Sequence, residues 1–176
     1  MPKRPCVFCQ GEVETPANPV RALESFPAKL RATVRGLAPD ALAWRPSPRE
    51  WTMKEIARHL GDVEMVYGVR FRAMLAEEDP LLLTLDQERW AAGLGYVKDN
   101  LADALDLFAA LRRWNVLIVK RAGPKNWERG GRHARYGRVT VRQLLDHVVH
   151  HDTSHLKQIL SVKSTLPRGG RKRRRS

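Results

Sequence analysis

Three histidines in this sequence have the spacing of ligands to a single metal ion. His151 and His155 lie four residues apart in a segment with helical apolar periodicity, so their Cβ atoms are about 5–6 Å apart on one helix face. His59 takes an inward position in an earlier segment, three residues from Ile56 and four from Val63. No His, Asp, Glu or Cys follows His155, so a further protein ligand must come from upstream. We therefore predict a three-imidazole metal site with open coordination positions, as in metal sites that do chemistry.

The sequence is compatible with several ions at this site and with several neighbouring side chains. Imidazole ligands suit Zn²⁺, Ni²⁺ or Fe²⁺. An open position allows either activation of water as hydroxide or formation of a thiolate that attacks a substrate. His147, one turn before His151, is an alternative third ligand, although three ligands along one helix surround an ion less well than ligands from two. Carboxylates are expected to orient the rings, and the candidates, each equally suited to be a surface charge, are Glu55, Asp62 and Asp152.

Four segments with apolar residues at steps of three and four predict long helices. They cover residues 20–37, 52–76, 101–121 and 140–164. Capping-box patterns stand at two of the starts, Thr52 with Glu55 and Thr140 with Gln143, whereas Pro27 predicts a kink or a later start in the first helix. Because strand alternation is not convincing anywhere, we predict an all-α four-helix bundle.

The connections between these helices are less regular. Residues 38–50 are rich in proline and predict a loop, and residues 81–97 are ambiguous, with a short helix around 86–92. Residues 124–139 are rich in Gly and Arg, contain His133, and predict a loop or a hairpin.

The chain has the length of one domain with an extension at each end. A core of ordinary size fits 176 residues, and we assign the metal-binding bundle to residues 20–164. Residues 1–19 contain four prolines and no apolar period, so we expect a flexible arm. Residues 165–176 hold an Arg-rich run that cannot bury apolar surface, so we expect a disordered tail.

The predicted arm carries the two cysteines of the sequence, Cys6 and Cys9. A Cys-x-x-Cys pair is half of a zinc knuckle, but no second pair exists and no histidine is close in sequence. The simplest interpretation is a reduced, exposed pair. A metal shared with another chain and a redox role are the alternatives.

Net charge is +13, and the basic residues are unevenly distributed. Six of the 32 lie in residues 168–176, which contain no acid. This tail can bind nucleic acid weakly and without sequence preference through phosphates, or it can simply be solvated.

No apolar run approaches the ~20 residues of a membrane span, and the N-terminus lacks the apolar centre of a secretory signal. We expect a cytoplasmic protein that does not enter membranes.

Two segments of the sequence resemble the DinB superfamily of metal-binding four-helix bundles. The segment from Trp51-Thr-Met-Lys-Glu-Ile-Ala-Arg to His59-Leu-Gly-Asp is similar to the first-histidine segment of that family. The segment Gly137-Arg-Val-Thr-Val-Arg-Gln-Leu-Leu, followed by His151-Asp-Thr-Ser-His155-Leu-Lys-Gln158-Ile, is similar to its closing motif. The resemblance covers residues 20–162 and implies the same ligands, His59, His151 and His155.

The resemblance also suggests activities for the chain. Members of the family transfer low-molecular-weight thiols such as bacillithiol and mycothiol, catalyse thiol-dependent isomerisation, or are thought to hydrolyse substrates. The leading hypothesis is therefore a metal-dependent thiol S-transferase acting on a small molecule, followed by a metal-dependent hydrolase. The rival is a non-catalytic metal-binding protein that associates with nucleic acid through its basic tail. We also expect a homodimer, given the extent of apolar periodicity.

Overall fold

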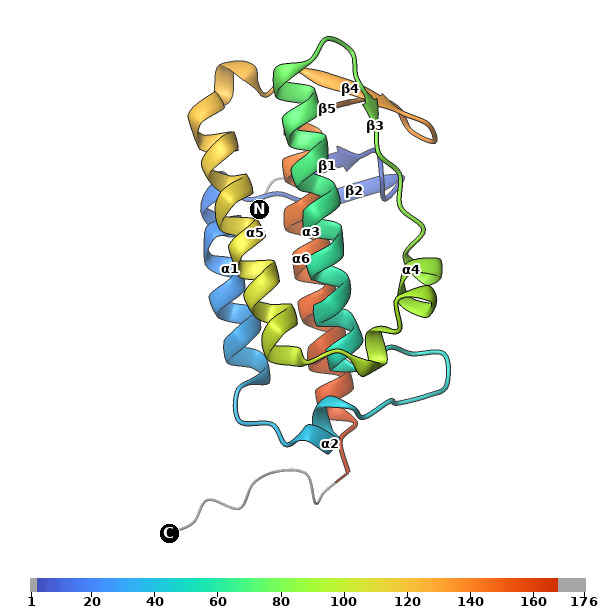
Figure 1. Ribbon diagram of the computed structural model, residues 1–176. Coiled ribbons are helices and arrows are strands. Elements are labelled where there is room, and N and C mark those ends of the chain that lie inside the picture. The colour runs from blue at the N-terminus through green and yellow to red at the C-terminus, as the bar shows by residue number, and fades with distance from the viewer. Residues whose placement is uncertain (1–2, 168–176) are drawn as a thin grey trace.

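The computed structural model describes residues 3–167, and its main body is a bundle of four long helices (Figure 1). The helices are α1 (Pro19–Val34), α3 (Met53–Ala76), α5 (Leu101–Ala122) and α6 (Val141–Ser164). Helices α1 and α3 each contact both α5 and α6. The predicted four-helix bundle is confirmed, with a few short strands added to it.

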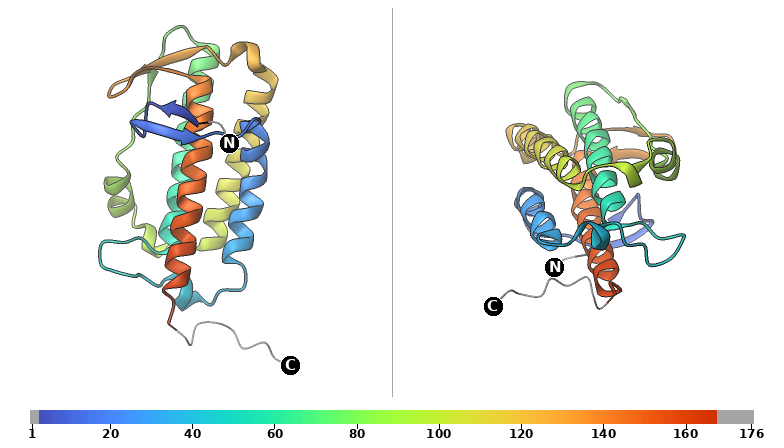
Figure 2. Two further views of the ribbon diagram at one scale, coloured as in Figure 1. Left: turned by 180° about the vertical axis from the view of Figure 1, so that it is seen from behind. Right: turned by 60° about the horizontal axis from the view of Figure 1, so that its bottom comes forward.

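The directions of the helices require one long crossover connection. Helices α3 and α5 run in the same direction, and α1 and α6 run in the opposite one (Figures 1 and 2). Residues 77–100 therefore return along the length of the bundle between α3 and α5. This crossover contains β3 (Leu81–Leu82), α4 (Gln87–Gly93) and the 3-10 turn η1 (Tyr96–Lys98). The other short elements are α2 (Pro39–Leu42) and η2 (Pro124–Asn126).

Side-chain caps fix the starts of the long helices. The Thr52 hydroxyl accepts the Glu55 N–H at 3.2 Å, and the Thr140 hydroxyl accepts the Gln143 N–H at 3.2 Å, so both predicted capping boxes are confirmed. Helix α1 begins at Pro19 and includes Pro27, so a later start of that helix is wrong. These caps set the register in which α3 and α6 present their side chains.

A small sheet covers one end of the bundle. Strands β4 (Gly130–His133) and β5 (Gly137–Thr140) form an antiparallel hairpin, and β3 pairs parallel with β4. A Cβ on Gly131 would lie 2.7 Å from the Pro80 carbonyl oxygen, so this close approach requires glycine. The sequence left open whether this segment is a loop or a hairpin. It is a hairpin, and it places His133 beside α3.

The N-terminal residues correct one expectation. Instead of an irregular arm, residues 3–14 form a hairpin of β1 (Lys3–Cys6) and β2 (Gly11–Glu14) that contacts α6. Cys6 and Val13 are buried, and the Arg4 guanidinium pairs with Asp146 at 3.2 Å. These contacts join residues more than 130 positions apart, so no local pattern could show them.

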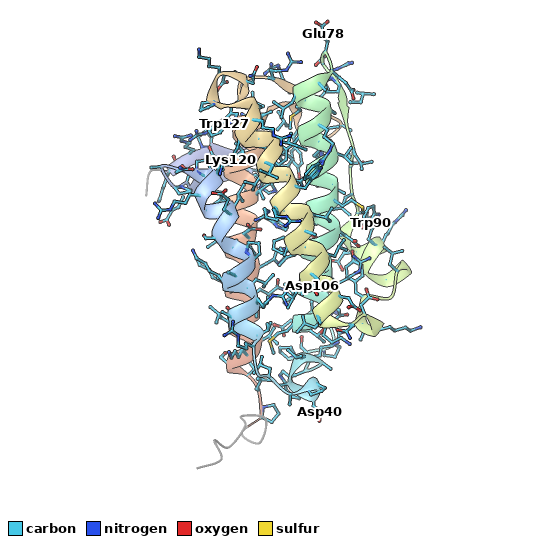
Figure 3. All side chains as sticks on the ribbon, turned by 60° about the vertical axis from the view of Figure 1, so that its left-hand side comes forward. Asp40, Glu78, Trp90, Asp106, Lys120 and Trp127 are labelled. Atoms are coloured by element: carbon cyan, nitrogen blue, oxygen red, sulfur yellow. The ribbon has the colours of Figure 1, made fainter. Side chains whose placement is uncertain are left out.

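Apolar side chains from all four long helices fill the bundle (Figure 3). They form two clusters, one around Tyr67, Phe71 and Leu145, and the other around Phe26, Ile56 and Phe108. Within residues 3–167, no helix combines the length and apolar character needed to cross a membrane. The predicted tail falls mostly outside this range, since residues 168–176 are not among the described ones.

Candidate metal centre

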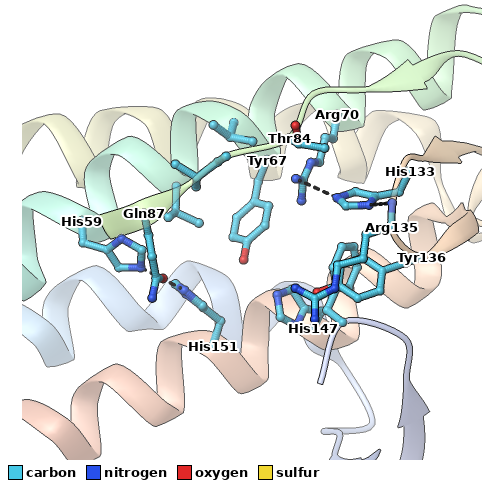
Figure 4. Close-up of a pocket in the computed structure, with 14 residues that line it drawn as sticks. His59, Tyr67, Arg70, Thr84, Gln87, His133, Arg135, Tyr136, His147 and His151 are labelled. Atoms are coloured by element: carbon cyan, nitrogen blue, oxygen red, sulfur yellow. Dashed lines mark hydrogen bonds between the residues drawn. The ribbon is translucent and has the colours of Figure 1, made fainter. Parts of the chain in front are cut away.

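The three predicted ligands converge between two helices. His59 lies on α3, and His151 and His155 lie one turn apart on α6. The Nε2 atoms of His59 and His151 are 3.3 Å apart, and those of His151 and His155 are 3.1 Å apart. His59 and His151 point toward each other in Figure 4. The alternative ligand His147 instead turns its Nδ1 toward the Cys6 sulfur, 3.4 Å away, so His59 completes the cluster.

Two of the three separations among these nitrogens fit one small cation. With zinc–nitrogen bonds of about 2.05 Å, two nitrogens at a tetrahedral angle are about 3.3 Å apart. The two separations given above match this distance. Three lone pairs directed at one point repel one another unless a cation or a proton lies between them. The donor set therefore suits a divalent ion with a position left for water or substrate, although metal binding itself stays a prediction.

Burial keeps these imidazoles in the neutral form that binds metal. Burial, and then the neighbouring His155, lowers the pKa of His59 to about 3. Burial also lowers the pKa of His151 and of His155. The Nδ1 atoms of His59 and His151 are buried without a hydrogen-bond partner in the part of the chain that the structure describes. At neutral pH the cluster thus has no positive charge of its own that would repel a cation.

An amide, not a carboxylate, orients one of the rings. The Nδ1 atom of His155 lies 2.8 Å from the Oε1 atom of Gln158, one turn further along α6. An amide oxygen only accepts, so the imidazole donates from Nδ1 and keeps its Nε2 lone pair for the cluster. Gln158 lies in the row of α6 that also holds His151 and His155.

The two carboxylates on α3 that were expected to orient the rings have other partners. Glu55 accepts the Thr52 N–H at 2.8 Å within the capping box. Asp62 accepts the Tyr96 hydroxyl at 2.6 Å. Both are buried, and neither has a hydrogen bond to an imidazole, so that expectation is wrong for them.

Asp152, the third candidate, belongs to a buried ion network on the other side of α6. Arg112 from α5 donates to Asp152 at 2.6 Å and to Glu64 at 2.8 Å. All three side chains are at most 4% exposed. Burial opposes the charge on Arg112, but Asp152 and Glu64 raise its pKa overall, so it stays protonated. Asp152 therefore supports the bundle and does not orient a histidine.

A pocket of about 360 Å³ opens beside the histidine cluster (Figure 4). His59 and His151 form part of its wall, so a molecule in the pocket would lie next to an ion held by the cluster. The volume is in the range of about 300–1,000 Å³ that is typical of small-ligand sites. Aromatic and basic side chains dominate the rest of the wall, among them Phe8, Tyr67, Arg70, His133, Arg135 and Tyr136.

Known proteins match this chain in sequence and in fold. A model of the DinB superfamily matches residues 22–159. The chain belongs to the DinB superfamily. OB0782 of Oceanobacillus iheyensis is 26% identical over 143 residues, which cover 81% of this chain and 83% of that protein. YfiT of Bacillus subtilis is 27% identical over 153 residues, which cover 84% of this chain and 83% of YfiT.

The names of both DinB relatives describe inferred metal-dependent hydrolases. A solved structure of YfiT superposes with a TM-score of 0.79 at 22% identity, covering 88% of this chain and 93% of that one. It is described as having an unusual four-helix bundle topology. This chain, too, departs from a simple up-and-down bundle, because a crossover joins the parallel helices α3 and α5.

One buried basic residue in the wall of this DinB pocket has no acidic partner. Arg70 on α3 is 6% exposed, and its Nε donates to the Leu83 carbonyl oxygen at 2.9 Å. Its guanidinium lies 5.8 Å from the ring centre of Tyr67 and 5.7 Å from that of Phe8. Among residues 3–167, no carboxylate lies within ion-pair distance of it. A buried cation without an anion, facing a pocket, provides a site for a negatively charged group.

Sequence reasoning found the histidines of this DinB site but missed the basic part of the pocket wall. Arg70 follows Val63 and Val66 at steps of three and four, so a charge occupies an inward position of the helix. That break in the apolar stripe was the available signal. Nothing local, in contrast, places His133 and Tyr136 of the β4–β5 hairpin at the same pocket.

Proposed function

We propose that this DinB protein is a metal-dependent hydrolase that acts on a small anionic molecule. The observation that carries the proposal is the opening of a neutral three-imidazole cluster onto a pocket whose wall holds the unpaired Arg70. The names of the relatives OB0782 and YfiT support hydrolysis as the reaction class. Arg70 supports a carboxylate or phosphate group on the substrate.

Each part of the site has a role in this reaction. A divalent cation held by His59, His151 and His155 would supply water activated as hydroxide near neutral pH. Arg70 would bind the acidic group and so orient the substrate. Tyr67 points into the pocket (Figure 4), and burial raises the pKa of its hydroxyl, which stays protonated and can donate a hydrogen bond to a substrate oxygen.

Thiol S-transfer, the leading hypothesis from the sequence, would use the same cluster with a thiolate in place of water. The relatives' names favour hydrolysis, so we place S-transfer second. The two reactions differ in their requirement for a low-molecular-weight thiol, and one assay separates them.

The test is a screen of metal-loaded protein against small aryl esters and amides, with and without a carboxylate or phosphate group. Separate samples contain zinc, nickel or ferrous iron, and each is assayed with and without thiol. We expect hydrolysis without thiol, dependent on metal and abolished by His155→Ala. Consumption of substrate only when thiol is present would support S-transfer, and turnover unaffected by a chelator or by His155→Ala would overturn both.

Arg70 supplies the test of the substrate class. Removing its charge in Arg70→Met should raise KM for anionic substrates by about 10- to 100-fold and leave neutral ones nearly unchanged. The matched control is Arg72→Met on the same helix, because Arg72 donates to Asn115 at 2.9 Å and does not line the pocket. Equal effects of Arg70→Met on neutral and anionic substrates would contradict an anion site.

The rival function and the dimer stay predictions. Nucleic-acid binding was assigned to residues 168–176, which lie outside the described residues. Deleting them should leave hydrolysis unchanged and remove any salt-sensitive affinity for nucleic acid. The mass of the assembly in solution would test the homodimer.

A further inference from the structure

The two cysteines and the remaining pocket-side histidine of α6 form a second cluster of metal-ligand atoms. We propose that Cys6, Cys9 and His147 bind a zinc ion that fastens the β1–β2 hairpin to α6. The two sulfurs are 3.2 Å apart, and the Nδ1 atom of His147 lies 3.4 Å from the Cys6 sulfur and 3.7 Å from the Cys9 sulfur. The three donors come from two segments that are more than 130 residues apart in sequence.

These separations are close to those of a tetrahedral zinc site. With zinc–sulfur bonds of about 2.3 Å and zinc–nitrogen bonds of about 2.05 Å, sulfurs are about 3.8 Å apart and sulfur and nitrogen about 3.6 Å apart. Binding requires the sulfurs to separate by about 0.6 Å, which small side-chain rotations allow. Both cysteines are free, and thiolate with imidazole is a donor set that suits zinc. Each thiol loses its proton to solvent as the ion binds.

The hairpin turn has features of a zinc knuckle. Cys6 ends β1 opposite Gly11, and the turn between them contains Cys9 and the left-handed Gln10, at φ 54°. The Cys9 N–H donates to the Cys6 sulfur at 3.4 Å. Such a bond stabilises negative charge on a sulfur, which a thiolate ligand requires.

The imidazole is held in place for this role. The ring of Phe8, between the two cysteines, stacks on His147 with centres 4.3 Å apart and planes 27° apart. The Arg4–Asp146 ion pair, next to His147 on α6, holds β1 against the helix independently of the cysteines. Among residues 3–167, no fourth His, Cys, Asp or Glu joins this cluster, so water would complete the coordination.

This ion would support the wall of the pocket beside the three-histidine cluster. Phe8 is part of the pocket wall, and its ring contacts His133 and Tyr136 edge-on at 5.7 and 5.1 Å. Because its ligands Cys6 and Cys9 stand on either side of Phe8 in the sequence, a bound zinc ion would hold the Phe8 ring in the wall. In this proposal the ion fixes Phe8 in the wall, and the reaction is assigned to the three-histidine cluster.

The experiment uses reduced, full-length protein in two forms that each lack one cluster. His59→Ala/His151→Ala removes the first cluster, and Cys6→Ser/Cys9→Ser removes the second. We expect about two zinc ions per chain in the parent and about one in either variant. With Co²⁺ in place of zinc, sulfur-to-metal charge-transfer absorption should appear in the parent and in His59→Ala/His151→Ala, and be absent from Cys6→Ser/Cys9→Ser.

The cobalt spectrum of His59→Ala/His151→Ala keeps the test decisive even if the cysteine variant fails to fold. Absence of the charge-transfer absorption from the reduced parent would overturn the proposal. So would an unchanged zinc content in a folded Cys6→Ser/Cys9→Ser protein. Isolation of the native protein with Cys6 and Cys9 joined as a disulfide, and without thiolate-bound metal after reduction, would assign the pair a redox role instead.

Discussion

His151 and Asp152 are neighbours on α6 but belong to two buried polar regions of opposite character. His151 joins a cluster of like groups, in which two Nδ1 atoms have no hydrogen-bond partner among the described residues and a pocket opens alongside. Asp152 joins Arg112 and Glu64 in a network of opposite charges whose side chains are at most 4% exposed. Two adjacent residues thus face two regions built by different rules.

The difference shows how buried polar groups divide between stability and function. In the Arg112 network, both Nη groups donate to carboxylates, so the cation is paired within the protein. In the histidine cluster, the Nε2 atoms lie against one another and not against an opposite charge, and an external cation would complete them. A protein keeps such incomplete sites at a cost in stability, which makes them candidates for binding.

Breaking the ion network should have the largest effect on stability. Arg112→Ala leaves Glu64 and Asp152 buried side by side without a counter-charge, and we expect the free energy of unfolding to fall by about 3–5 kcal/mol. Urea unfolding followed by circular dichroism measures the loss. Arg113→Ala, at an exposed position of the same helix, is the matched control and should change little. A loss below about 1 kcal/mol for Arg112→Ala would mean that the network contributes no more than a surface pair.

Mild acid should destabilise the metal-free protein because its histidines are held in the neutral form. The pKa values of His59 and His147 are about 3 in the fold, against about 6.5 in an unfolded chain, so below pH 6.5 the unfolded chain binds more protons. Stability of the metal-free protein should therefore fall with pH, by about 1 kcal/mol for each of these two histidines between pH 6.5 and 5.5. The lowered pKa values of His151 and His155 act in the same direction.

Urea unfolding in the presence of a chelator at the two pH values measures this loss. His59→Gln removes one of these groups, so its loss over the same interval should be about 1 kcal/mol smaller than that of the parent. A parent protein that is equally stable or more stable at pH 5.5 would contradict the assignment of neutral, buried histidines.

The sequence was sufficient for the parts of this comparison that depend on helical spacing. Steps of three and four residues predicted all four long helices, and the i, i+4 pair with His59 predicted the cluster that the structure brings together. The capping boxes at Thr52 and Thr140 depend on neighbours within three residues, so they too could be predicted. Local spacing determines each of these features.

Features that depend on partners distant in sequence could not be predicted in this way. Asp152 looked like a ligand-orienting or surface charge because its partner Arg112 lies 40 residues away on α5. Strand β1 contains Pro5 and shows no apolar alternation, and it is ordered by contacts with α6. The Cys6–Cys9 pair therefore seemed isolated from any histidine, although the fold brings His147 to it.

Gln158 offers the smallest and most selective change on the histidine side. Its Oε1 atom fixes the His155 ring from outside the cluster, so Gln158→Ala should leave all three ligands present and weaken metal binding by about 10- to 100-fold. Competition with a coloured chelator measures the affinity, and Lys157→Ala, at the adjacent exposed position, is the control. Because Gln158 has no part in the Arg112 network, the stability of the metal-free protein should change by less than about 1 kcal/mol. A variant that bound metal normally but unfolded easily would place Gln158 with the supporting network and break the division between the two faces of α6.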